Sequence, residues 1–128
     1  MSKTLLPPTT RRTIQATSKV IHTAYPRVIY VIELDPAAAA DPVFAKDNPH
    51  LLEGMPCLYV GSTSQTAEER FGQHLSGVSA ARIVALWGRK LRYDLMPAQK
   101  PIKRERALML ERSLARDLRR QGFAVSQH

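Results

Sequence analysis

Two short apolar runs in the first half of the chain predict paired strands. Residues 28–32 (VIYVI) are β-branched and aromatic, which is the composition of a buried strand, and residues 57–60 (CLYV) have the same character. Four prolines punctuate residues 35–56 between them, so we interpret this segment as a long connection with a short helix inside it. The two strands are therefore expected to pair antiparallel as an enlarged hairpin.

Residues 66–77 carry the start and stop signals of a helix. Thr66 and Glu69 have the spacing of a capping box, and Gly77 is a typical residue just beyond a helix end. A helix is therefore expected over residues 67–76. The apolar side chains that follow the i, i+4, i+8, i+11 pattern form its expected buried stripe. They are Ala67, Phe71, Leu75 and Val78.

The second half of the chain alternates helical and strand-like patterns. Residues 80–91 predict a second amphipathic helix, and the alternation over residues 91–96 predicts a third strand. Residues 103–120 predict the last helix, after which residues 123–125 are expected to return to the sheet edge. The expected fold class is α+β, with a small, mostly antiparallel three-stranded sheet flanked by helices.

One carboxylate interrupts the apolar side of the last helix. At about 100° per residue, its leucine and alanine side chains occupy an arc of roughly 160°, and Glu111 falls in the middle of that arc, whereas Glu105 points to the polar side. A buried carboxylate is costly unless it is paired or holds a metal ion. Glu111 could thus pair with Arg70, lie at the edge of a groove, or bind a metal.

The positive charge of the chain is concentrated in one block. The net charge is +8, and residues 82–120 hold twelve basic and four acidic residues, so this block accounts for the whole excess. Such a block favours polyanions, and its arginines suit bidentate phosphate contacts, although a solvated pair of charged helices would look similar. The expected nucleic-acid contacts are Arg82, Arg89, Lys90, Arg92, Arg104, Arg112 and Arg116.

The size of the chain predicts one domain. We expect residues 1–26 to form a flexible basic N-terminal arm and residues 27–128 to form the domain, with residues 35–56 as an inserted connection. No apolar run approaches the ~18–20 residues that cross a bilayer, and the N-terminus lacks a secretory pattern, so no membrane partner is expected. Cys57 is the only cysteine, which excludes an internal disulfide and makes the cytoplasm the expected compartment.

Two kinds of chemistry are excluded by spacing. One cysteine and four scattered histidines do not form a structural zinc pattern, and no P-loop or dinucleotide glycine pattern is present.

Four other residues are more informative about the function. Tyr30 and Tyr59 lie on the two expected strands, and Arg70 and His74 share one helix face. Each has a structural explanation by itself, such as strand propensity or a surface position; their order along the chain is more specific.

This order resembles that of the GIY-YIG nuclease superfamily. Residues 28–30 (VIY) stand where the family has its first tripeptide, and residues 59–61 (YVG) stand where it has the second. The helix that follows carries Arg70 and His74 at the family's catalytic positions. In the last helix, residues 107–111 are similar to the segment that ends in the metal-binding glutamate. The resemblance covers about residues 27–120.

Three departures from the family pattern bear on the substrate more than on catalysis. The first tripeptide begins with Val28 in place of glycine, and the asparagine often found after the last helix is not evident. Tyr30 and Tyr59 are 29 residues apart, more than is usual in the family. Residues 35–56 are therefore expected to be an insertion close to the substrate.

The resemblance implies a metal-dependent endonuclease that hydrolyses phosphodiester bonds in DNA with a single Mg²⁺ or Mn²⁺ ion held by Glu111. Its partner would be DNA, with RNA as an alternative, in the cytoplasm at the nucleoid, in DNA repair or in a mobile element or phage. A protein partner could supply specificity. A DNA- or RNA-binding module of the same fold that does not cut is an alternative. So is a protein-interaction adaptor, which would leave Glu111 unexplained.

The resemblance also implies a role for each site residue. Tyr30 would be the general base, which requires nearby cations to lower its ordinary pKa of about 10. Arg70 would neutralise charge in the transition state, and His74 would orient a group or share a proton. Tyr59 would position the water or the phosphate, and Gly61 would let the backbone turn beside the site.

Overall fold

The computed structural model describes residues 26–77, 81–98 and 100–127. The expected N-terminal arm, apart from Pro26, lies outside the described residues, and so does Val78. The described part is an α+β fold, as expected, built on one mixed sheet. No helix within the described residues is long and apolar enough to cross a bilayer.

The sheet has four strands, one more than expected, in the order β3-β1-β2-β4. Their bounds are β1 Val28–Leu34, β2 Cys57–Thr63, β3 Gly88–Leu91 and β4 Ala124–Gln127. Strand β1 pairs antiparallel with β2, as predicted, and with β3, whereas β4 pairs parallel with β2. The return of the chain to the sheet edge after the last helix is therefore confirmed as the fourth strand.

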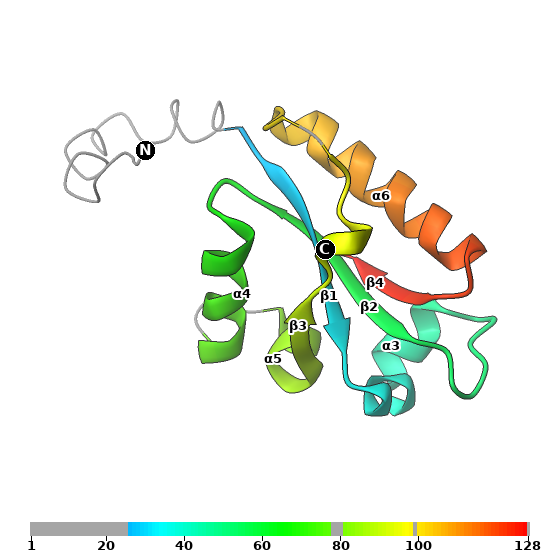
Figure 1. Cartoon of the computed structure of the whole chain (residues 1–128). Helices are drawn as coiled ribbons and strands as arrows, with labels where there is room; N and C mark the ends of the chain where they lie inside the picture. Colours follow the sequence, from blue (N-terminus) through cyan, green and yellow to red (C-terminus); the bar gives the residue numbers. More distant parts are fainter. Residues whose placement is uncertain (1–25, 78–80, 99, 128) are drawn as a thin grey trace.

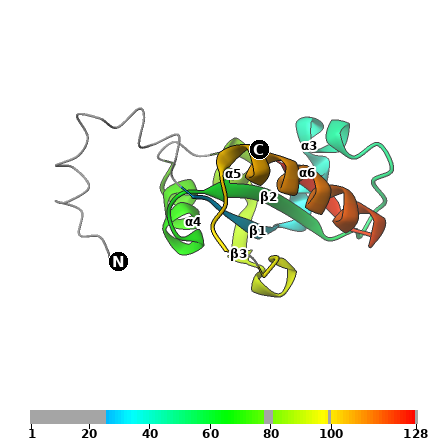
Figure 2. The same ribbon diagram turned by 90° about the horizontal axis from the view of Figure 1, so that it is seen from above.

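Helices cover both faces of this sheet (Figures 1 and 2). They are the 3-10 helices η2 Pro36–Ala40 and η3 Tyr93–Leu95 and the α-helices α3 Pro42–Asp47, α4 Ala67–Ser76, α5 Arg82–Trp87 and α6 Arg104–Arg120. Helix α6 packs against one face, and α3, α4 and α5 pack against the other. The last helix is thus confirmed to within one residue of its expected start.

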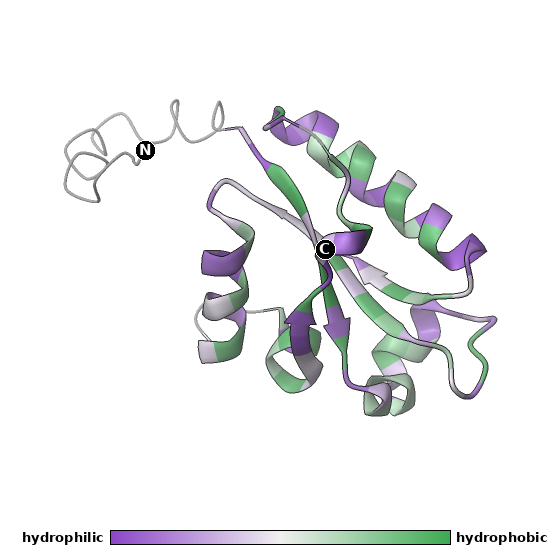
Figure 3. Ribbon diagram, viewed as in Figure 1, coloured by the Kyte–Doolittle hydropathy of each residue, from purple (hydrophilic) through white to green (hydrophobic). Residues whose placement is uncertain are grey.

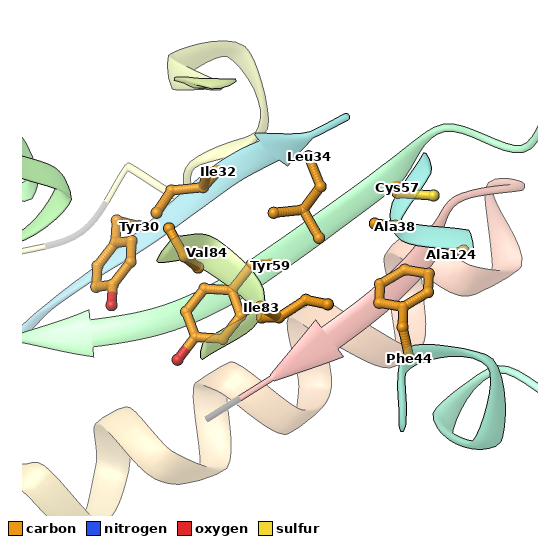
Figure 4. Packing of buried hydrophobic residues seen from close by; sticks show 10 residues of the cluster. All are labelled: Tyr30, Ile32, Leu34, Ala38, Phe44, Cys57, Tyr59, Ile83, Val84 and Ala124. Atoms are coloured by element: carbon orange, nitrogen blue, oxygen red, sulfur yellow. The ribbon is translucent and has the colours of Figure 1, made fainter. Parts of the chain in front are cut away.

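Alternation along the central strands divides the core into two layers. In β1, Ile29 and Val31 point toward α6, whereas Tyr30 and Ile32 point toward α4 and α5. Because both faces are covered, successive side chains of β1 and β2 are buried, and in Figure 3 the hydrophobic residues of these strands are interrupted by more polar ones. Figure 4 shows the layer that contains Tyr30, with Val84 of α5 packed against it.

Helix α4 has the predicted bounds, and its buried face agrees with the expected one except at Leu75. The hydroxyl of Thr66 accepts the Glu69 N–H at 3.1 Å, the Glu69 carboxylate accepts the Thr66 N–H at 3.1 Å, and Gly77 follows with a φ of 84°. Leu75, expected in the buried stripe, is 51% exposed, whereas its neighbour His74 is completely buried. Ala67 and Phe71 of the expected stripe do pack against the core, so the difference is confined to the last turn of α4, where His74 takes the place of Leu75.

The expected helix over residues 80–91 and the expected strand over residues 91–96 are wrong in their bounds. Helix α5 ends at Trp87, and the next four residues form β3, which pairs Leu91 with Ile32 of β1. A Cβ atom at Gly88 would lie 2.6 Å from the Val84 carbonyl oxygen, so glycine permits the tight change from helix to strand. Pairing with β1 outweighs the amphipathic helical pattern here.

The connection over residues 35–56 is ordered and contains η2 and α3, so the predicted short helix within it is confirmed.

The side chain of Asn48 binds this connection to the outer edge of β4. The Asn48 amide nitrogen donates to the Val125 carbonyl oxygen at 3.0 Å, and its oxygen accepts the Val125 N–H at 2.8 Å. The Arg119 guanidinium donates to the same Asn48 oxygen and to the Val125 carbonyl oxygen.

Candidate functional site

A pocket opens at the end of the sheet where β1 begins and β2 ends. Its volume is about 390 Å³, and it lies between α4 and the first turns of α6, which flank this end of the sheet in Figure 1. The residues that line it come from β1 and the residue before it, the end of β2 and the turn after it, α4, and α6. They are Arg27, Tyr30, Ser62, Thr63, Ser64, Gln65, Arg70, Arg104, Leu108 and Glu111.

Gly61 makes room for the phenol of Tyr30. The two residues are direct partners in the β1–β2 register, and their side-chain positions are on the same face of the sheet. A Cβ atom at Gly61 would lie 2.6 Å from the Tyr30 hydroxyl oxygen and 3.1 Å from the Tyr59 ring. Gly61 was expected to turn the backbone, but it lies inside β2, and its contribution is the space left by the missing side chain.

Hydrogen bonds on both ring nitrogens fix the tautomer of the neutral His74 ring. The Ala81 N–H donates to Nδ1 at 3.0 Å, so Nδ1 must be an unprotonated acceptor. The neutral ring therefore carries its proton on Nε2, which lies 2.9 Å from the Tyr30 hydroxyl oxygen. His74 thus donates to Tyr30, and the Tyr30 hydroxyl proton is free to point elsewhere.

Tyr59 lies behind Tyr30 and is 2% exposed. The centroid of its ring is 6.2 Å from that of Tyr30 and 5.8 Å from that of His74, so the three rings pack as one cluster. In Figure 4 the hydroxyl groups of Tyr30 and Tyr59 point in the same direction. Tyr59 was expected to position water or phosphate, but it does not line the pocket and instead supports Tyr30.

The electrostatic environment of Tyr30 is opposite to the expected one. Burial raises the pKa of Tyr30 above its ordinary value, and the positive charge of the neighbouring Arg70 only partly offsets this. The negative charge of Glu111 raises the pKa of Tyr30 further. Burial likewise raises the pKa of Tyr59. The groups of the chain itself therefore keep both phenols protonated at neutral pH.

The rotation of successive residues around α6 places Glu111 at the wall of the pocket. Arg104, Leu108 and Glu111 are spaced i, i+4 and i+7, so one side of the helix presents all three to the pocket. Glu111 is 1% exposed and is the only acidic side chain among the described residues that line the pocket. Within the described residues, no three His, Cys, Asp or Glu side chains form a metal cluster.

Three of the expected nucleic-acid contacts have counter-charges inside the fold. Arg82 pairs with Asp41 at 2.8 Å, and Arg89 lies 3.8 Å from Asp35. Arg92 pairs with Glu33 at 3.1 Å and with Asp94 at 2.9 Å. These three arginines connect β3, α5 and the start of η3 to neighbouring segments, and their charge is partly neutralised there.

The other four expected contacts are exposed, and three of them follow α6. Arg104 lines the pocket, and Arg112 and Arg116 follow it at i+8 and i+12, about 80° and 120° around α6 from Arg104. Lys90 lies on the edge strand β3. The block of positive charge is therefore divided between ion pairs near β3 and a row of arginines that starts at the pocket.

The sequence analysis did not include Arg27, the polar end of β2 or the turn after it among the site residues. Ser62 and Thr63 at the end of β2 and Ser64 and Gln65 in the turn line the pocket. The run GSTSQT directly after the second expected strand was a usable signal, because small hydroxyl residues in a loop bind anions readily. Arg27 had no such signal, since its place in the pocket depends on contacts with the segment before α6.

No known family, curated protein or solved structure matches the chain. The site is therefore defined by its own geometry. Tyr30, Arg70 and Glu111 meet at one pocket, and Tyr59 and His74 contact Tyr30 from behind.

Proposed function

We propose that the chain is a divalent-metal-dependent endonuclease of the GIY-YIG type that hydrolyses phosphodiester bonds in DNA. The observation that carries this proposal is the meeting of Tyr30, Arg70 and Glu111 at one pocket, although they come from three separate elements. Packing alone does not require that a phenol, a guanidinium and a carboxylate meet at one solvent-filled pocket. The single cysteine and the basic charge suggest action in the cytoplasm, at nucleoid DNA.

The charge of the pocket supports a phosphodiester as the substrate. Arg27, Arg70 and Arg104 line it, against the single carboxylate of Glu111. Arginine matches phosphate geometry with paired N–H donors. From Arg104, the row formed with Arg112 and Arg116 extends along about 18 Å of α6 at 1.5 Å per residue and winds around the helix by about 120°. A polymer with regularly spaced phosphates fits this row better than a small anion does.

The donor groups in the pocket fit Mg²⁺ or Mn²⁺. Glu111 offers a hard carboxylate, Ser62 and Ser64 add neutral oxygens nearby, and none of the described residues that line the pocket carries a thiol or an imidazole. A single carboxylate, completed by water and substrate phosphate, is the usual way in which Mg²⁺ is held at such sites. A bound ion of this kind supplies positive charge that polarises the phosphate and stabilises the leaving oxygen.

The side chains of the chain would share the remaining steps. Tyr30 first loses its own proton to solvent, and the resulting phenolate then accepts a proton from the attacking water as the new P–O bond forms and the old one breaks, while the leaving oxygen takes its proton from solvent. The Nε2–H of His74 points at the Tyr30 oxygen and stabilises the phenolate that exists before the proton transfer. Arg70 lies beside Tyr30, where its charge stabilises both the phenolate and the phosphate in the transition state.

A cleavage assay in the presence of Mg²⁺ or Mn²⁺ tests the proposal. The substrates are linear, nicked, flapped and branched DNA, with RNA as a separate panel. We expect Glu111→Gln and Tyr30→Phe to lower the cleavage rate by about 10²-fold or more. Glu105→Gln is the matched control, because Glu105 is an exposed carboxylate on the same helix and does not line the pocket. A wild-type chain that cuts no substrate, or a Glu111→Gln variant that cuts like wild type, contradicts the proposal.

The raised pKa of Tyr30 favours one alternative, a DNA- or RNA-binding module that does not cut. A phenol that keeps its proton can donate to a phosphate oxygen without removing a proton from water. The same assay separates the two functions when binding is measured beside cleavage. Tight binding of nucleic acid with no cleavage under any metal ion supports the binding module.

A further inference from the structure

We infer that Arg27 and Arg104 form a second phosphate subsite in the pocket. It would hold the nucleic-acid phosphate next to the one at Tyr30, Arg70 and Glu111. This inference rests on the proposed function, because it describes how the same pocket grips its substrate. Its test, however, measures binding and not cleavage.

The backbone brings the two arginines together. The Arg27 N–H donates to the Ile102 carbonyl oxygen at 2.6 Å, and the Ile102 N–H donates to the Arg27 carbonyl oxygen at 2.9 Å. This isolated bridge fixes the residue before β1 against the segment that leads into α6, whose first residue is Arg104. By strand alternation Arg27 is on the same face as Ile29, which is the face that α6 covers. Both guanidinium groups therefore line the same pocket from α6's side of the sheet.

The charges of these two arginines are not neutralised within the fold. Among the described residues, neither Arg27 nor Arg104 forms an ion pair, in contrast to Arg82, Arg89 and Arg92. Among the described residues that line the pocket, Glu111 is the only carboxylate, and it forms no ion pair with Arg27 or Arg104. A second phosphodiester would supply the counter-charge at the Arg27–Arg104 pair. Guanidinium groups without a counter-charge in a concave wall are suited to bind an anion.

The size and the lining of the pocket also exceed what one phosphate needs. A volume of about 390 Å³ lies in the range of roughly 300–1,000 Å³ that is typical of pockets for small organic ligands. Ser62, Ser64 and Gln65 add hydroxyl and amide donors to the wall. A segment of backbone with two successive phosphates matches this combination of size, charge and neutral donors.

The salt dependence of DNA binding tests the subsite. The affinity of the full chain for a short duplex is measured at several salt concentrations in EDTA, so that no cleavage occurs. Each phosphate contact contributes a slope of about −0.9 to a plot of log K against log salt. We expect Arg27→Gln and Arg104→Gln each to reduce the steepness of the slope by nearly one such unit. Arg27→Lys, which keeps the charge, should retain the slope.

Arg106→Gln is the matched control. Arg106 is an exposed arginine near the start of α6, but it lines a different surface, beside Met109 and Leu110. We expect Arg106→Gln to leave the slope of log K against log salt unchanged. Thermal unfolding of every variant identifies any loss of fold. Because Arg104 is exposed, Arg104→Gln should fold normally and still tests the subsite if Arg27→Gln is unstable.

The outcomes distinguish the subsite from the nuclease proposal. If wild type binds DNA and both glutamine variants keep its slope, the subsite is wrong, whether or not the chain cuts. If the variants lose slope and wild type cuts nothing, the subsite is supported and the nuclease proposal fails. If wild type binds neither DNA nor RNA, both are overturned. If Arg106→Gln lowers the slope as much as Arg27→Gln does, the effect is general surface charge and the subsite is wrong.

Discussion

The hydroxyl oxygen of Tyr30 lies 2.9 Å from Nε2 of His74, and His74 is oriented from its other side by the Ala81 N–H. Because a backbone N–H can only donate, this second bond decides the direction of the first. His74 is a donor to Tyr30, so it stabilises negative charge on the phenol oxygen and does not remove its proton. The proton of Tyr30 is then available to a group in the pocket.

The tautomer of His74 can be measured directly. In ¹⁵N NMR of the histidine ring at neutral to slightly alkaline pH, we expect His74 to have a protonated Nε2 and an unprotonated Nδ1. Ring signals of the exposed His50 serve as the reference for a histidine without such constraints. A ring protonated on Nδ1 would contradict the bond from Ala81 and reverse the direction of the bond to Tyr30.

Gly61→Ala should destabilise the fold and displace Tyr30. The new methyl carbon would meet the Tyr30 hydroxyl at 2.6 Å and its ring carbon at 2.7 Å, inside a strand that cannot move aside. We expect a loss of about 1–3 kcal/mol in the free energy of unfolding, as for other overpacked sites. If the chain cleaves DNA, Gly61→Ala should also lower the cleavage rate, because it displaces Tyr30.

Gly72→Ala is the control for that substitution. Gly72 lies within α4, and a Cβ atom there would meet nothing within 4 Å. The change should increase the free energy of unfolding by about 0.5–1 kcal/mol, because alanine favours helix more than glycine does. Denaturant unfolding of both variants checks the pair. Equal stability of Gly61→Ala and wild type would mean that Tyr30 does not lie over Gly61.

The two buried tyrosines should make the fold sensitive to alkali. Burial raises the pKa of Tyr30 and of Tyr59 in the folded chain. Above about pH 10, the unfolded phenols lose their protons while the folded ones keep them, so the free energy of unfolding falls as pH rises. Each tyrosine contributes at most about 1.4 kcal/mol per pH unit in this range.

Denaturant titrations between about pH 9 and pH 11 measure this dependence. Tyr59→Phe should flatten it, since phenylalanine fills the same space and has no proton to lose. Tyr30→Phe should do the same but also removes the acceptor of the His74 N–H. An unchanged slope in both variants would show that the phenols ionise as easily in the folded chain as in the unfolded one.

Cleavage should increase with pH if Tyr30 is the base. Because its pKa is raised, only a small fraction of the folded chain carries a phenolate at neutral pH. We expect kcat/KM, measured at saturating metal, to rise about tenfold per pH unit from neutral toward alkaline pH. A flat profile would assign the proton transfer to another group.

The cap of α4 should contribute to both stability and activity. Thr66→Ala removes the hydroxyl that accepts the Glu69 N–H and should cost about 1 kcal/mol. Thr66→Ser keeps the acceptor and should behave like wild type. Because α4 carries Arg70 and His74, fraying of its first turn should also slow cleavage. A Thr66→Ala variant as stable as Thr66→Ser would mean that the cap has no energetic effect.

The elements that were predicted correctly have strong local signals. The bounds of α4 depend on Thr66, Glu69 and Gly77, all within one short segment. The β1–β2 pair follows from two β-branched runs that have no other place to be buried. Glu111 could be selected because it interrupts an apolar arc, and Tyr30, Arg70 and His74 could be selected by their order along the chain.

The features that were missed depend on distant partners. Strand β3 exists because Leu91 pairs with Ile32, and no local pattern separates it from the preceding helix. His74 replaces Leu75 in the core because its two ring nitrogens find partners in Tyr30 and Ala81, which compensates for burying a polar ring. Arg27 enters the pocket only through its bridge to Ile102.

The contact between Asn48 and Val125 has a consequence for association between chains. An edge strand with unpaired N–H and C=O groups is a template on which a second chain can add a strand. At β4 the side-chain amide of Asn48 occupies both groups of Val125, as a neighbouring strand would. The opposite edge, β3, is only four residues long and exposes Arg89 and Lys90. The inserted connection thus protects the sheet from growing into an intermolecular one.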